Sequence, residues 1–189
     1  TIVFAHEAGI ADRLAIVDQE TSPTNRNPEV FAVNPLGKVP VLVTPEAGAI
    51  FDSLVICDYL DGLHDGRRLI PAEGSARWQA LRLHAIAQGL CDAGIALRWE
   101  TLRRPEHLRY PPLSEGQTAK LVESFDVLER NESFEEPVHI GHIGLATALA
   151  WLEFRNLPDF RTGRPRLTHW YEAFSRRPSM QATAYHGET

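Results

Sequence analysis

The chain has 189 residues, a formal net charge of −6 and an apolar fraction of 43%, which are ordinary values for a globular protein. Its acidic balance argues against a nucleic-acid-binding surface, because such a surface clusters Lys and Arg. No apolar run approaches the ~18 residues of a membrane span. We therefore expect neither nucleic acid nor a membrane as a partner. The two isolated cysteines, Cys57 and Cys91, favour a reducing cytoplasm over a disulfide framework.

The first part of the chain mixes short elements. Residues 2–9 predict the end of a helix that stops at Gly9, and the apolar run Leu14–Val17 predicts a buried strand. Residues 18–33 are mostly polar and contain two prolines and two asparagines. This composition predicts a loop that could contain one helical turn.

A β-hairpin and a helix follow. Val41–Val43 and Ala49–Phe51 are predicted strands, joined by the turn Thr44–Gly48. Asp52 and Ser53 are both good helix caps, so we expect a helix to begin there and to end near His64.

Beyond this helix the composition changes. Residues 66–73 contain Gly, Pro and charge and predict a linker, after which every apolar pattern has helical spacing. Helices are predicted over residues 75–102, 114–131, 141–154 and 165–176. The sequence thus predicts a small α/β domain at 1–65, a linker at 66–73 and an all-helical domain at 74–189.

The stretch GKVPVL carries the first candidate site. Pro40 precedes a strand, where it cannot donate a ladder hydrogen bond. A cis peptide bond at Pro40 would turn the backbone N–H and C=O of Val39 outward, so that they could pair with an extended peptide as a further strand does. The alternative is a plain turn into the strand.

The stretch FDS carries the second candidate site. A helix N-terminus binds carboxylates through unpaired N–H groups and its dipole, and the Ser53 hydroxyl adds a donor. Asp52 could hold an ammonium group, so the pair suits a zwitterionic amino-acid head. The alternative is an ordinary helix cap.

Six motifs occur in an order that resembles a known family. They are HEAGIADRL, NPLGKVPVL, IFDSLVICDYL, RLIPAEG, HIGHIGLATALAWLEFR and LTHWYEAFSRRPSM. Together they resemble the cytosolic glutathione transferases of the bacterial type, over essentially the whole chain. The resemblance implies a thioredoxin-like α/β N-terminal domain, an all-α helical-bundle C-terminal domain and a cytoplasmic homodimer. It also implies detoxification chemistry, in which glutathione is the co-substrate and its thiolate is conjugated to a small electrophile.

The resemblance also implies roles for single residues. Pro40 matches the cis proline of the family, and Val39 matches the residue whose backbone pairs with the cysteinyl part of glutathione. Asp52 and Ser53 match the pair that holds the γ-glutamyl end. Lys38 lies where a basic or polar side chain often meets the glycyl carboxylate, with a solvated lysine as the alternative. Asp92 resembles an acidic position near the dimer cleft, or else is a solvated charge. No metal site is expected.

One departure concerns the start of the chain. Family members begin with a strand and a loop that carries the catalytic Ser, Tyr or Cys, whereas Thr1 here already falls inside the following helix. No residue can therefore be assigned the catalytic role. Three explanations are open: further N-terminal residues in the native protein, a strand donated by a partner chain, or a rearranged or disordered Leu14–Val17 strand. A non-catalytic dimeric binding or regulatory module is the alternative to an enzyme.

A second departure lies at HIGHIG. The family often caps this buried helix with Ser or Thr and with Asp three residues later, but here those positions are His139 and His142. Imidazoles cap less well, so we expect a cost of ~0.5–2 kcal/mol and a pH-sensitive fold. The alternative is that backbone groups and water satisfy the helix end.

Overall fold

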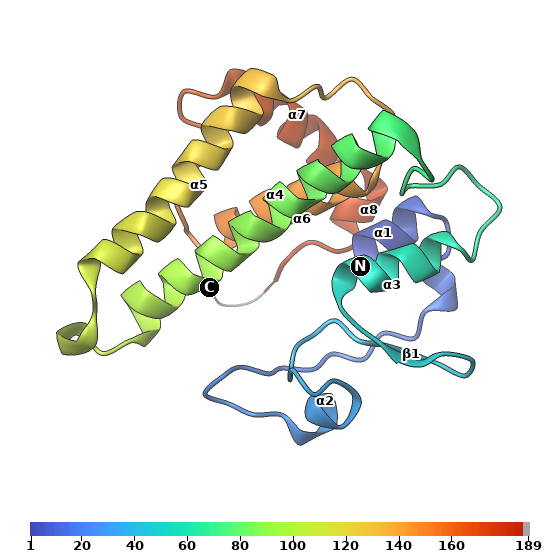
Figure 1. Cartoon of the computed structure of the whole chain (residues 1–189), viewed down its shortest axis with the longest axis horizontal. Coiled ribbons are helices and arrows are strands. Elements are labelled where there is room, and N and C mark those ends of the chain that lie inside the picture. Colours follow the sequence, from blue (N-terminus) through green and yellow to red (C-terminus); the bar gives the residue numbers. More distant parts are fainter. Residues whose placement is uncertain (187–189) are drawn as a thin grey trace. The chain divides into compact units, whose positions relative to one another are not determined.

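The computed structural model describes residues 1–186 and divides into two compact units, Thr1–Ile70 and Pro71–Thr189 (Figure 1). The last three positions of the predicted helical domain, 187–189, lie outside the described residues. No described helix is long and apolar enough to cross a membrane.

The N-terminal unit is a two-stranded sheet with short helices (Figure 1). Its elements are α1 (Ile2–Glu7), the 3₁₀ turn η1 (Ala11–Arg13), α2 (Pro28–Val33), β1 (Leu42–Thr44), β2 (Gly48–Ile50) and α3 (Ser53–Asp61). The strands pair antiparallel in the register Leu42 to Ile50 and Thr44 to Gly48, which confirms the predicted hairpin. Asn27 caps α2 by accepting hydrogen bonds from two backbone amides, so the expected loop contains a helix of six residues.

The core of this unit lies between α1 and α3. Phe4, Ile56 and Leu60 are fully buried. Cys57 is also buried in α3, and this burial is the main cause that raises the pKa of its thiol. The buried Asp61 carboxylate accepts hydrogen bonds from the Leu69 and Ile70 amides at 2.9 and 3.0 Å and so ties the segment after α3 to the core.

The predicted buried strand at Leu14–Val17 is wrong. These residues are in no strand, and the side chains of Ile16 and Val17 are 55% and 73% exposed. A strand forms only where a neighbour completes its ladder of hydrogen bonds. In residues 1–186 no strand lies beside this segment. Its β-branched residues favour an extended backbone, but without a neighbouring strand to accept and donate hydrogen bonds they form no sheet.

The C-terminal unit is helical, and the four predicted helices are confirmed. Its elements are α4 (Gly74–Arg98), the π-helical turn η2 (Trp99–Arg103), the 3₁₀ turn η3 (Glu106–Leu108), α5 (Pro111–Asn131), α6 (Ile140–Phe154), α7 (Pro165–Ser175) and α8 (Pro178–Gln181). α6 is the most deeply buried helix of the unit and packs against α4 and α7 (Figure 1).

Glycines let α4 and α6 run side by side in the same direction. A Cβ atom on Gly141, at the start of α6, would lie 2.6 Å from the Ala80 carbonyl oxygen near the start of α4. A Cβ on Gly94, near the end of α4, would lie 2.8 Å from side-chain atoms of Trp151 and Leu152 near the end of α6. The two helices therefore approach closely at both ends.

We predict opposite effects for two glycine substitutions in α4. Gly94→Ala should lower the free energy of unfolding by about 1–3 kcal/mol, because the added methyl overpacks the contact with α6. Gly89→Ala should raise it by roughly 0.5–1 kcal/mol, because Gly89 has open space and alanine is the better helix former. Denaturant unfolding of both variants measures this, and equal effects would contradict the close packing at Gly94.

Two stacked imidazoles begin α6. His139 is the N-cap residue, and its Nδ1 accepts a hydrogen bond from the Gly141 amide at 3.1 Å, so the predicted imidazole cap is confirmed there. His142 does not cap; its ring stacks on that of His139 with centroids 3.8 Å apart. The ring is 1% exposed and its Nε2 has no hydrogen-bond partner in the described chain. Burial, and then the charge of His139, lower the pKa of His142 to about 4.

The fold should lose stability on mild acidification. The unfolded chain protonates His142 near pH 6.5 and the folded chain only near pH 4, so its contribution is complete above pH 6.5 and falls as the pH drops towards 4. The full loss is on the order of 3–4 kcal/mol. Unfolding free energies at pH 7.5 and 5 should differ more for the parent chain than for His142→Gln. The exposed His107→Gln is the control, and an unchanged difference in His142→Gln would contradict this account.

Candidate functional site

The hairpin register brings the two predicted motifs to one end of the sheet. Leu42 pairs with Ile50, so the residues just before β1 and just after β2 leave the hairpin side by side. Val39–Pro40 precedes β1 by one residue, and Asp52 begins α3 two residues after Ile50. Segments 12 residues apart in the sequence thus form one surface, which we call the hairpin-end site: Lys38, Val39, Pro40, Asp52 and Ser53.

The Val39–Pro40 peptide bond is cis, as the sequence predicted for the binding interpretation of this motif. Val39 is 51% exposed, and neither its backbone N–H nor its C=O has a hydrogen-bond partner among residues 1–186. Exposed main-chain groups of this kind can pair with an extended peptide in the manner of an added strand.

The loop before Val39 is held in place by a residue that the sequence interpretation missed. Asn34 is 2% exposed; its Nδ2 donates to the Lys38 carbonyl at 2.8 Å and its Oδ1 accepts from the Leu36 amide at 3.0 Å. Gly37 has a φ of 60°, and a Cβ there would collide with the Phe31 ring. The Asn, Pro and Gly residues of NPLGK are turn signals that could have indicated this brace.

The N-terminus of α3 supplies the charged half of the site. Asp52 is the N-cap, and its Oδ1 accepts a hydrogen bond from the Leu54 amide at 3.1 Å. The Ser53 amide and hydroxyl donate to no described residue, so both can serve a ligand at the positive end of the helix. The Asp52 side chain is exposed and can therefore also face a cation.

Lys38 and Asp92 lie in different units. Lys38 is exposed next to Val39 and makes no ion pair with any described residue. Asp92 is an exposed residue of α4 in the helical unit.

The hairpin-end site combines three kinds of recognition. It offers an unpaired main-chain donor and acceptor at Val39, a carboxylate at Asp52 and two free donors at Ser53. A peptide whose end carries both an ammonium and a carboxylate group matches this set. The arrangement is suited to binding rather than to bond making, since none of these groups is a nucleophile with a base beside it.

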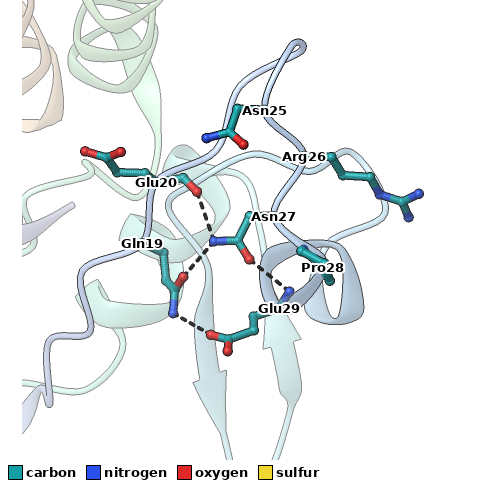
Figure 2. Close-up of a pocket in the computed structure, with 7 residues that line it drawn as sticks. All are labelled: Gln19, Glu20, Asn25, Arg26, Asn27, Pro28 and Glu29. Carbon is teal, nitrogen blue, oxygen red and sulfur yellow. Dashed lines mark hydrogen bonds between the residues drawn. The ribbon is translucent and has the colours of Figure 1, made fainter.

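A hollow on the same unit is lined by polar groups that hydrogen-bond to one another (Figure 2). It is lined by Gln19, Glu20, Asn25, Arg26, Asn27, Pro28 and Glu29. Asn27 Nδ2 donates to Gln19 Oε1 at 2.7 Å and to the Glu20 carbonyl at 2.9 Å, and Gln19 Nε2 donates to Glu29 Oε2 at 2.8 Å. These bonds hold the loop onto the start of α2, so we assign the hollow a structural role. The described residues contain no group of three or more His, Cys, Asp or Glu arranged to hold a metal ion.

Comparisons with known proteins show the family to which this chain belongs. Residues 1–63 match the family model described as "Glutathione S-transferase, N-terminal domain", and residues 93–173 match that described as "Glutathione S-transferase, C-terminal domain". The GST-like protein YibF of Escherichia coli (strain K12) is 31% identical over 85% of this chain and 82% of its own length. The chain belongs to the glutathione S-transferase family.

Solved structures of glutathione transferases share the whole fold. A family member from Pseudomonas fluorescens Pf-5, with bound glutathione, superposes with a TM-score of 0.94 at 37% identity and covers 98% of this chain and 92% of that one. A glutathione S-transferase from Methylobacillus flagellatus KT, also with glutathione bound, gives 0.83 at 30% identity, over 97% of this chain and 92% of that one. Both units of this glutathione S-transferase family member therefore have close structural counterparts.

Proposed function

We propose that this chain is a glutathione transferase that binds glutathione at the hairpin-end site and conjugates its thiolate to a small electrophile. The unpaired main chain of Val39, next to cis Pro40 and to the open N-terminus of α3, is the observation that carries the proposal. The glutathione bound to the two similar transferases adds support. The proposal includes glutathione as co-substrate, a cytoplasmic homodimer, and detoxification as the role.

Each residue of the site has a proposed partner on the tripeptide. The Val39 amide and carbonyl pair with the backbone of the cysteinyl residue. Asp52 holds the γ-glutamyl ammonium group, and the Ser53 amide and hydroxyl hold the neighbouring carboxylate. Lys38 meets the glycyl carboxylate. We also propose that Asp92 lies at the dimer cleft of the homodimer.

The reaction requires glutathione in its thiolate form. A donor close to the sulfur lowers the thiol pKa, and the thiolate then attacks the electrophilic carbon and expels its leaving group. We assign this donor to none of residues 1–186. Cys57 does not serve as a nucleophile of its own, because it is buried and its pKa is raised.

Glutathione affinity should depend on the two residues at the start of α3. Asp52→Asn keeps the capping oxygen but loses the charge opposite the ammonium group, so we expect about 10–100-fold weaker binding. Ser53→Ala removes one neutral donor and should weaken binding by roughly 2–10-fold. Isothermal calorimetry measures both. Asp58→Asn, an exposed position on the same helix, is the control, and equal affinities in all variants would refute the assignment.

The second candidate is a non-catalytic dimeric module that binds glutathione for regulation. It is favoured by the make-up of the hairpin-end site, which offers hydrogen-bonding and charged groups for binding and no nucleophile with a base beside it. The two functions differ in turnover: an enzyme should conjugate glutathione to an electrophilic aromatic chloride well above the uncatalysed rate at pH 7. A chain that binds glutathione but leaves this rate unchanged is a module, and that outcome would contradict our first choice.

A further inference from the structure

Three arginines gather at one end of the helical unit. Arg98 is the last residue of α4, Arg103 ends the π-helical turn η2, and Arg155 is the C-cap residue of α6. α4 and α6 run in the same direction, and Gly94, one turn before Arg98, contacts Trp151, one turn before Arg155. The ends of α4 and α6 therefore lie side by side with Arg98 and Arg155 at them, and we call these two residues together with Arg103 the arginine cluster.

The three positive charges act on one another. Burial lowers the pKa of Arg98 first, and the charges of Arg155 and then Arg103 lower it further. Such repulsion stands out in a chain whose formal net charge is −6. An anion between the guanidinium groups would relieve it.

The described residues do not neutralise the first two arginines. Neither Arg98 nor Arg103 forms an ion pair within residues 1–186, and the Arg98 Nε is buried with no hydrogen-bond partner. Glu100 lies between them in sequence, but its carboxylate accepts from Arg104 Nε at 2.7 Å and from the Tyr110 amide at 2.5 Å. The nearest carboxylate along the chain is thus engaged elsewhere.

Aromatic rings adjoin the cluster. The Arg155 guanidinium lies 4.7 Å from the centroid of the Phe154 ring, and the Tyr185 ring stacks on Phe154 at 5.3 Å. Tyr185 is 41% exposed, and its hydroxyl is a hydrogen-bond donor at neutral pH. Guanidinium groups beside aromatic rings suit a ligand with an acidic group on an apolar body.

We propose that Arg98, Arg103 and Arg155 form a binding site for the carboxylate of a small aromatic acid, with Phe154 and Tyr185 against its ring. Favourable contact between arginines and helix carbonyls accounts for one arginine at each helix end. It does not account for Arg103 as a third arginine of the cluster, or for the buried Arg98 Nε that has no hydrogen-bond partner among the described residues. The proposal concerns the helical unit alone and does not depend on glutathione binding.

The test compares 2-naphthoate with its neutral analogue 2-naphthamide by calorimetry on the full chain without glutathione. The acid should bind at least about ten-fold more tightly, and Arg98→Gln combined with Arg103→Gln should abolish this preference. Arg176→Gln is the matched control, because Arg176 also caps a helix C-terminus, that of α7, and should leave the preference intact.

Two results would overturn the proposal. One is equal binding of acid and amide, or no binding of the acid at millimolar concentration. The other is a preference that the double variant leaves unchanged. If the double variant fails to fold, Arg103→Glu at its exposed position replaces it, and the acid should then bind at least about ten-fold more weakly.

Discussion

The antiparallel register of one short hairpin is the constraint on which the hairpin-end site depends. Because Leu42 pairs with Ile50, the residues just before β1 and just after β2 lie at the same end of the hairpin. A shift by one residue would turn the strand faces over and separate Val39 from Ser53. Two local features complete the arrangement: the buried Asn34, which holds the entering loop, and the Asp52 cap, which starts α3.

In the helical unit, α6 fulfils two tasks. It is buried along most of its length, and the close contacts at Gly141 and Gly94 set how its two ends lie against α4. At its start, the His139 imidazole caps the helix and the buried His142 ring stacks on it, and we expect this buried pair to make the stability of the fold sensitive to acid. At its end, Arg155 comes level with Arg98, and the same packing thereby creates the arginine cluster.

Local signals predicted most of the structure. The helical spacing of apolar residues indicated the four long helices, and the motifs around Pro40 and Ser53 indicated the hairpin-end site, because each depends on nearby residues. The strand at Leu14–Val17 failed because a strand needs a partner that local sequence does not specify. The brace at Asn34 and the Asp61 bonds to Leu69 and Ile70 were missed for a similar reason: a side chain that satisfies a loop backbone leaves no periodic pattern. The arginine cluster arises from helix packing across more than 50 residues of sequence and has no motif.

The central claim is that the main chain at Val39 and the start of α3 grip one peptide ligand together. Amide chemical shifts recorded by NMR during a glutathione titration test this directly, because they report on the backbone groups themselves. We expect the Val39 and Ser53 amide chemical shifts to change together along one saturable curve. The chemical shifts of the amides at Asn25 and Glu29, which line the hollow, should not change. Saturable binding that leaves both amides unshifted would contradict it.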